Sequence, residues 1–264
     1  GGCWSGPVRY TAAEDALAGL EFSSEARAQI VPTEFAKGPA RGLLGLGPPK
    51  LRFPKAKEER DRVFLLAKVP WDPGESLHLS MLATARANLL DQLGPDAQSY
   101  QCPAALGDHW EDVGFQGSDP RRDLNRSTGI LAVLQMLRWS ELAPEASRRL
   151  LQKLASADRF GAQTFACLSL GFTLSALQAL RRGALYPRCI RHEAVLPALH
   201  DLHQAQCLDL LGRLAPFEGK PGTQACTEAG PQVDIWVHTN EMRAALAKVD
   251  GAQVDAYLAA HLAS

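Results

Sequence analysis

Apolar residues recur at helical spacing in separate segments of this chain. Residues 76–93 read SLHLSMLATARANLLDQL, where leucines and alanines stand three or four positions apart, as on the buried face of an amphipathic helix. The same spacing predicts a helix over about residues 127–139, and further patterns of this kind lie at residues 57–69 and 192–214. No segment shows the sustained alternation that is typical of strands. The pattern therefore predicts an all-α fold.

One long apolar segment carries no charge. Residues 160–180 contain no acidic or basic side chain and are long enough to span a bilayer. Polar side chains are nevertheless scattered through the segment: Gln163, Thr164, Ser169, Thr173, Ser175 and Gln178. This mixture favours a central helix that is buried on all sides over a membrane span.

Composition narrows the class of protein. The chain has 264 residues, 46% of them hydrophobic, and a formal net charge of −1, so it can bury a large core and does not favour nucleic acid as a partner. Its six cysteines form no CxxC pair, which is typical of a reduced intracellular protein without a disulfide framework or zinc ribbon.

Two apparent ligand-binding motifs fail on their chemistry. The glycine-rich stretch at 42–50 lacks the GK[ST] ending of a phosphate-binding loop, and its prolines remove backbone donors. His200, His203 and Cys207 share one face of a predicted helix, but no fourth ligand stands near them in sequence. We therefore expect no metal site and no bound cofactor.

The amino terminus offers two lipidation sites. If a Met preceded Gly1, the start GGCWS would fit the N-myristoylation pattern, and Cys3 could take a palmitoyl chain as a second anchor. The other interpretation is a remnant of cleavage or cloning. The expected location is cytoplasmic, with peripheral membrane association if Gly1 is acylated.

The most charged turn of the chain precedes the helix predicted at 127–139. It reads WEDVGFQGSDPRRDLNRSTGIL, from Trp110 to Leu131. We expect Trp110 and Phe115 to anchor it in the core, the Asp119–Pro120 pair to set a turn, and Gln116 to be a buried support. Asp123 is expected to accept backbone N–H groups at the next helix start or to orient an arginine.

This stretch resembles the signature of the ELMO (engulfment and cell motility) domain. The matching elements are Trp110, Val113 to Gln116 with Gly114 and Phe115, Asp119–Pro120, Asp123–Leu124, Arg126, and Gly129 to Leu131. The resemblance extends over about residues 41–214. It implies an amino-terminal extension at 1–40, a single multi-helix ELMO domain at 41–214, a linker at 215–233, and a carboxy-terminal helical segment at 234–264 packed on the domain.

The resemblance also implies a function. Short ELMO-domain proteins activate GTP hydrolysis by Arf-family and Arf-like small GTPases, whereas the longer ones are scaffolds for a Rac exchange factor. The chain is more similar to the short group, so we expect a GTPase-activating protein rather than an enzyme with its own bound substrate. The alternative is a non-catalytic module that binds a GTPase or its exchange-factor complex.

Arg126 is the residue that the resemblance assigns to catalysis. In the family the proposed catalytic arginine stands two residues after the aspartate, where this chain has Asn125, so the alignment needs one inserted residue. Arg121 and Arg122 are close enough in sequence to compete for the role. The other interpretation of Arg126 is a structural clamp on Asp123 or Asp119.

Overall fold

The computed structural model describes residues 7–22, 51–93, 99–101, 106–155, 164–214 and 235–262, and it confirms the all-α fold. The helices are α1 (Ala13–Gly19), α3 (Ala56–Lys68), α4 (Ser76–Leu89), α5 (Arg121–Leu124), α6 (Gly129–Leu142), α7 (Pro144–Ala155), α8 (Thr164–Arg181), α9 (Tyr186–His192), α10 (Leu196–Leu214), α12 (Ile235–Leu246) and α13 (Gly251–Leu262), with a 3-10 helix, η2, at Asp108–Val113. The Gly/Pro-rich linker predicted at 216–231 lies outside the described residues.

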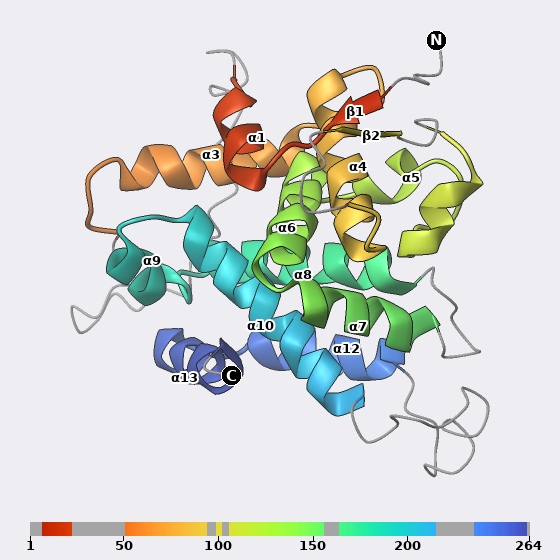
Figure 1. Ribbon diagram of the computed structural model, residues 1–264. Coiled ribbons are helices and arrows are strands. Elements are labelled where there is room, and N and C mark those ends of the chain that lie inside the picture. The colour runs from red at the N-terminus through yellow and green to blue at the C-terminus, as the bar shows by residue number, and fades with distance from the viewer. Residues whose placement is uncertain are drawn as a thin grey trace, which may run out of the picture.

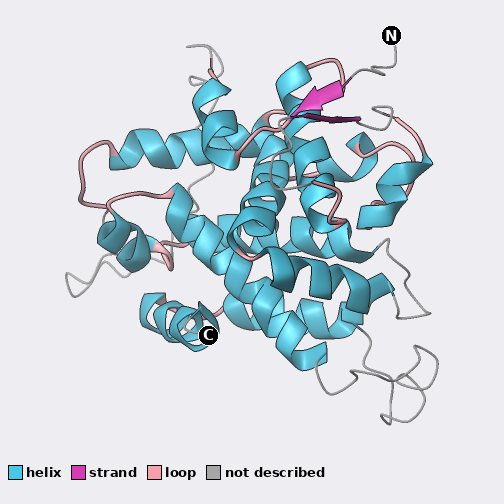
Figure 2. Ribbon diagram, viewed as in Figure 1, coloured by secondary structure: helices cyan, strands magenta, loops and turns pink. Residues whose placement is uncertain are grey.

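Two short strands were not anticipated from the sequence. β1 (Pro7–Arg9) pairs antiparallel with β2 (Ser99–Gln101), and Val8 stands opposite Tyr100 (Figure 2). Three residues are too few to show an alternating pattern, so no sequence signal distinguishes these strands from the loops around them.

Helix α6 forms the centre of the packing. It contacts α3 and α4, which lie toward the top of Figure 1, and α7, α8 and α10, which lie lower in the view. Its residues from Gly129 to Leu137 are all buried, because each face of the helix meets a neighbouring helix. The apolar run predicted at 127–139 thus becomes a fully enclosed helix rather than a surface helix with one buried face.

The uncharged segment predicted as a central helix is α8. Phe165, Phe172 and Leu177 are fully buried, while Gln178 at the far end is exposed. Two of its buried polar side chains have partners: the Thr173 hydroxyl donates to the Ser169 carbonyl at 3.0 Å, and the Ser169 hydroxyl bonds His203 at 2.9 Å. Within the described part of the chain, no helix is both long enough and apolar enough to cross a membrane.

The boundaries of α10 differ from the sequence prediction. A helix was expected from His192, but α9 ends there, and Glu193 takes a left-handed conformation with φ of 50°. The chain then turns into α10, and the Val195 amide donates to the Glu59 carboxylate of α3 at 2.8 Å. A carboxylate from a helix distant in sequence therefore fixes this start, which local spacing does not reveal.

The carboxy-terminal helices lie against the rest of the bundle. α12 packs on α8, and α13 packs on α9 and α10. The Tyr257 hydroxyl of α13 donates to Asp209 of α10 at 3.0 Å. The end of the described chain thus contributes to the same core as the central helices.

Acid is expected to destabilise the fold through a buried histidine. His203 is 1% exposed, beside Trp139 and Phe172, and burial lowers its pKa from 6.5 to about 4. In the unfolded chain His203 becomes protonated near pH 6.5, whereas in the folded chain it stays neutral until about pH 4. Its contribution to stability is therefore fully present above pH 6.5 and is lost as the pH falls toward 4. We expect a loss of about 2 kcal/mol from this residue between pH 7.5 and 5.0.

Urea unfolding at the two pH values measures the effect, with His203→Gln as the matched variant. The variant should lose about 2 kcal/mol less than the parent over this interval. Equal losses in parent and variant would show that His203 titrates similarly in the folded and unfolded states.

Candidate functional site

The charged stretch found in the sequence folds as a compact platform between α4, α6 and α8. Trp110 of η2 and Phe115 are both fully buried, with their ring centroids 6.5 Å apart in an edge-on arrangement. Gly114 between them has a φ of 89°, in the left-handed region that a side chain disfavours, and it turns the chain out of η2. These residues anchor one side of the platform.

A buried arginine of α4 fixes the position of η2. Arg86 donates to the His109 carbonyl at 3.1 Å and to the Asp112 carboxylate at 2.7 Å. Its side chain is 6% exposed, so the guanidinium is largely removed from water and charge-assisted bonds hold it in place. Nothing in the motif's spacing indicates this contact, because Arg86 lies on another helix.

Asp123 links α5 to the turn that follows η2. Its carboxylate is 4% exposed and accepts the backbone N–H of Gln116 at 2.9 Å. Of the two roles expected for Asp123, capping the next helix is wrong, since its backbone partner lies seven residues earlier, and the other, orienting an arginine, stays a prediction with Arg126 at 3.9 Å. Gln116 was expected to be buried, but it is exposed: its backbone amide bonds Asp123, and its side chain interacts with the Cys167 thiol.

The Asp119–Pro120 pair forms a turn that leads into α5. The Asp119 carbonyl accepts the Arg122 amide at 3.2 Å, and its carboxylate is taken by Arg121 with contacts of 2.7–3.1 Å. The guanidinium of Arg121 lowers the pKa of Asp119 by donating to the carboxylate. Arg121 is therefore engaged within its own turn.

Asn125 binds the chain segment between α3 and α4. Its side-chain carbonyl accepts the Trp71 amide at 2.7 Å, and its side-chain amide donates to the Trp71 carbonyl at 3.1 Å. Asn125 thus has a structural function, because its one side chain satisfies both backbone groups of Trp71.

Gly129 allows α6 to begin against the end of α3. Its φ is 47°, and a Cβ added there would lie 2.2 Å from the Val69 carbonyl oxygen. The same oxygen accepts the Ile130 amide at 2.9 Å. Only glycine lets the two chain segments come close enough for this hydrogen bond.

Replacing Gly129 with alanine is expected to destabilise the protein by about 3 kcal/mol or more, because the strained φ and the clash with the Val69 carbonyl add. Thermal melts of Gly129→Ala measure this. Gly117→Ala is the matched control, since a Cβ there would meet nothing within 4 Å. A Gly129→Ala protein that melts with the control would show that α3 and α6 are not held this close.

Arg126 lies between these anchors and points outward. Its side chain is 66% exposed, and its guanidinium is 3.9 Å from the Asp123 carboxylate, at the outer limit of an ion pair. Arg122 is exposed as well and forms no ion pair within the described residues. Of the candidate arginines, Arg126 stands on the part of the loop that is fixed on both sides.

The loop opens onto a pocket of about 180 Å³ between the motif, α8 and α12. Gln116, Asp123, Arg126 and Ser127 line it from the motif, and Cys167, Leu170, Gly171, Leu174 and Arg243 line it from the two helices. The platform, which is anchored by buried residues, thus borders a surface pocket that carries positive charge.

Comparison with known proteins identifies this platform. The model of the ELMO/CED-12 family matches residues 61–211, which include the whole motif and more than half of the chain. The chain belongs to the ELMO/CED-12 family.

Several ELMO proteins are similar to it. ELMO domain-containing protein 3 of Homo sapiens is 36% identical over 169 residues, and that of Bos taurus is 35% identical over 167. Each alignment covers 62% of this chain and 41% of the relative, so the chain spans well under half the length of these relatives. Engulfment and cell motility protein 3 of Mus musculus is 30% identical over 145 residues, 18% of its length. No solved structure matches the chain.

Cys167 lies against the ELMO motif without being reactive. Its thiol is 3.7 Å from the Gly114 carbonyl, and burial raises its pKa to about 11. The thiol therefore stays protonated at neutral pH, and this wall of the pocket lacks a nucleophile.

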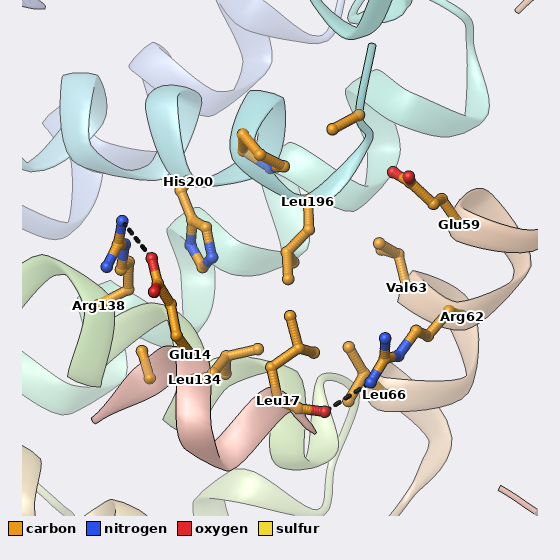
Figure 3. Close-up of a pocket in the computed structure, with 13 residues that line it drawn as sticks. Glu14, Leu17, Glu59, Arg62, Val63, Leu66, Leu134, Arg138, Leu196 and His200 are labelled. Atoms are coloured by element: carbon orange, nitrogen blue, oxygen red, sulfur yellow. Dashed lines mark hydrogen bonds and ion pairs between the residues drawn. The ribbon is translucent and has the colours of Figure 1, made fainter. Parts of the chain in front are cut away.

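A second pocket of the ELMO domain lies away from the motif. It has a volume of about 320 Å³ between α1, α3, α6 and α10, and Leu17 and Leu196 point toward each other across it (Figure 3). Its rim charges are engaged within the protein: Arg62 donates to the Leu17 carbonyl at 2.5 Å, and Arg138 pairs with Glu14 at 3.5 Å. Its charged rim is therefore committed to holding the helices together.

The remaining candidate residues do not form a site. His200 bonds Gln135 at 2.5 Å and His203 bonds Ser169 at 2.9 Å, so the histidines of α10 point to different partners. Among the described residues, no group of three side chains could hold a metal ion. Gly1 and Cys3 lie outside the described residues.

Proposed function

We propose that this ELMO protein activates GTP hydrolysis by an Arf-family or Arf-like small GTPase, and that Arg126 supplies the catalytic arginine in trans. The observation that supports this is the placement of Arg126. Its side chain is 66% exposed, yet the loop that carries it is bonded to Trp71 on one side and to Val69 on the other. The class of partner rests on the resemblance to the short ELMO-domain proteins.

The chemistry needs only one group from this chain. GTP hydrolysis places extra negative charge on the phosphate oxygens, and the GTPase already binds the magnesium ion and the phosphates. A guanidinium is planar, permanently charged and able to donate two parallel hydrogen bonds, so it stabilises this charge well. An arginine provided in this way accelerates hydrolysis by about 10³- to 10⁵-fold.

A rigid loop with an exposed tip suits this function. A side chain that must reach a nucleotide inside another protein has to project into solvent before the complex forms. Its backbone, however, must keep its position while the guanidinium binds the transition state. Buried Trp110 and Phe115 and the Asn125–Trp71 bonds meet the second requirement, and the exposure of Arg126 meets the first.

A non-catalytic binding module is the competing function. The observation in its favour is Asn125, which occupies the position of the family's arginine and is committed to Trp71. The inserted residue changes the direction from which Arg126 leaves the loop. In this case the same surface would bind a GTPase without accelerating hydrolysis.

A panel of Arf-family and Arf-like GTPases separates these functions. Each GTPase, loaded with GTP, is mixed with the protein, and both phosphate release and binding are measured. At least one member should hydrolyse GTP faster with the protein than alone. Binding without faster hydrolysis on every member would support the non-catalytic module instead.

A further inference from the structure

A second arginine reaches the pocket from outside the family match. Arg243 stands on α12, beyond the matched residues 61–211, and lines the same pocket as Arg126. Its guanidinium lies against α8, where a Cβ added to Gly171 would be 3.4 Å from Nη1. Helix α12 thus adds a positive charge to a site that the ELMO motif forms on its other side.

Among the described residues, the charge of Arg243 has no counter-ion. Its Nε is buried without a hydrogen-bond partner, and Arg243 forms no ion pair within the described residues. Burial lowers its pKa below the ordinary value of 12.5. A partly buried cation without a partner costs free energy, so it is expected where a ligand supplies the missing anion.

The pocket as a whole has an excess of positive charge. Arg126 and Arg243 face one carboxylate, Asp123, and that carboxylate already accepts the Gln116 amide. Ser127 adds a hydroxyl, while Leu170 and Leu174 provide apolar wall. These groups suit an anion that is carried on an apolar stem.

The size of the pocket limits which anion can enter. Its volume of about 180 Å³ is enough for the end of an acidic side chain from another protein. The nucleotide also stays in the phosphate loop of the GTPase during hydrolysis. When a small GTPase is the partner, the anion available to this pocket is therefore an acidic side chain on the surface of that partner.

We propose that Arg243 binds an acidic side chain of the GTPase, so that α12 contributes to the affinity for the partner while Arg126 acts on the nucleotide. This inference rests on the proposed function, because it takes a small GTPase as the partner. It assigns separate tasks to two arginines of one pocket: Arg243 governs how tightly the complex forms, and Arg126 governs how fast GTP is hydrolysed.

The test measures affinity and rate separately for Arg243→Met. Methionine keeps an unbranched stem against α8 but removes the charge. For the best-binding GTPase of the panel, loaded with a slowly hydrolysed GTP analogue, the Kd should rise roughly 10- to 100-fold. Arg243→Lys should recover part of the affinity, because it restores the charge but not the two parallel hydrogen bonds.

Arg182→Met is the matched control. Arg182 also contacts α12, donating to the Leu246 carbonyl at 3.0 Å, but it does not line the pocket. The control should bind like the parent. A Kd that rises equally in both variants would mean that loosening α12 is the cause, and the inference would be wrong.

A double-mutant cycle identifies the carboxylate. Acidic residues on the surface of the GTPase are neutralised one at a time and combined with Arg243→Met. The residue that enters the pocket should weaken binding of the parent but not of the variant, while other residues should act additively. If all of them are additive, Arg243 has no acidic partner.

The outcomes separate this inference from the proposed function. If Arg243→Met binds like the parent while Arg126→Ala loses stimulation, the inference fails and the proposed function stands. If Arg243→Met weakens binding to its GTPase while the parent stimulates no member of the panel, the inference stands and the proposed catalytic function fails. Normal affinity with a rate as low as that of Arg126→Ala would place Arg243 at the nucleotide instead, and absence of any binding would overturn both proposals.

Discussion

Replacing Arg126 with alanine is expected to remove most of the stimulated GTP hydrolysis and to leave the folded protein intact. The side chain is 66% exposed and lies 3.9 Å from Asp123, so the fold gains little from it. The stimulated rate should fall by about 10³-fold or more, because the transition state loses its added cation. Binding to the GTP-loaded partner should weaken far less, since this contact forms mainly in the transition state. Single-turnover hydrolysis and a thermal melt measure both parts.

Neighbouring variants show whether the assignment to Arg126 is correct. Arg126→Lys should restore little activity, because an ammonium lacks the planar fork of a guanidinium. Arg122→Ala is the matched control for an exposed charge on the same loop, and Arg121→Ala removes an arginine that already pairs with Asp119. Both should mainly change the rate of association. If one of these variants loses stimulation and Arg126→Ala keeps it, the catalytic arginine has been misassigned.

Replacing Trp110 with alanine is expected to have the largest effect on stability. The indole is fully buried and packs edge-on against Phe115. Large-to-small changes of this kind cost about 3–5 kcal/mol, a large part of the total stability of a typical domain. We expect the Tm to fall by about 10 °C or more, or the protein to become insoluble.

Trp110→Phe distinguishes the loss of volume from the loss of an aromatic ring. It keeps a ring against Phe115 and should lose less stability than Trp110→Ala. Circular dichroism melts of both variants give the comparison. A Trp110→Ala protein with the Tm of the parent would mean that the side chain is exposed in solution and available to a partner.

The helices themselves could be predicted from local spacing. The apolar positions of α4 and α6 recur at helical intervals, and a long uncharged segment indicated α8. Pro144 begins α7, as expected from its preference for the first turn. The predicted ends were less accurate. α4 ends at Leu89 instead of residue 93, and Asp91 then adopts a positive φ of 54°. Tertiary contacts decide such endings.

The contacts that build the candidate site could not be predicted in this way. In the sequence, Asn125 only stands where the family has an arginine, but in the structure it bonds Trp71, 54 positions away. Gly129 reads as a helix start, yet the Val69 carbonyl requires it. Arg243 reads as one charge on a surface helix, and only the packing of α12 on α8 brings it near Arg126. Each depends on segments that meet only after folding.

The two attachments to residues 69–71 also determine when the loop loses its conformational entropy. Ordering a residue's backbone costs about 1–2 kcal/mol, and here hydrogen bonds at Asn125 and Ile130 bracket the four residues between them. The loop is already ordered in the folded protein before a partner binds. The free energy of binding is therefore reduced little by ordering the loop. A peptide with the sequence of the motif but without residues 69–71 would lose this conformational entropy only on binding. It should therefore bind the partner more weakly than the whole domain does.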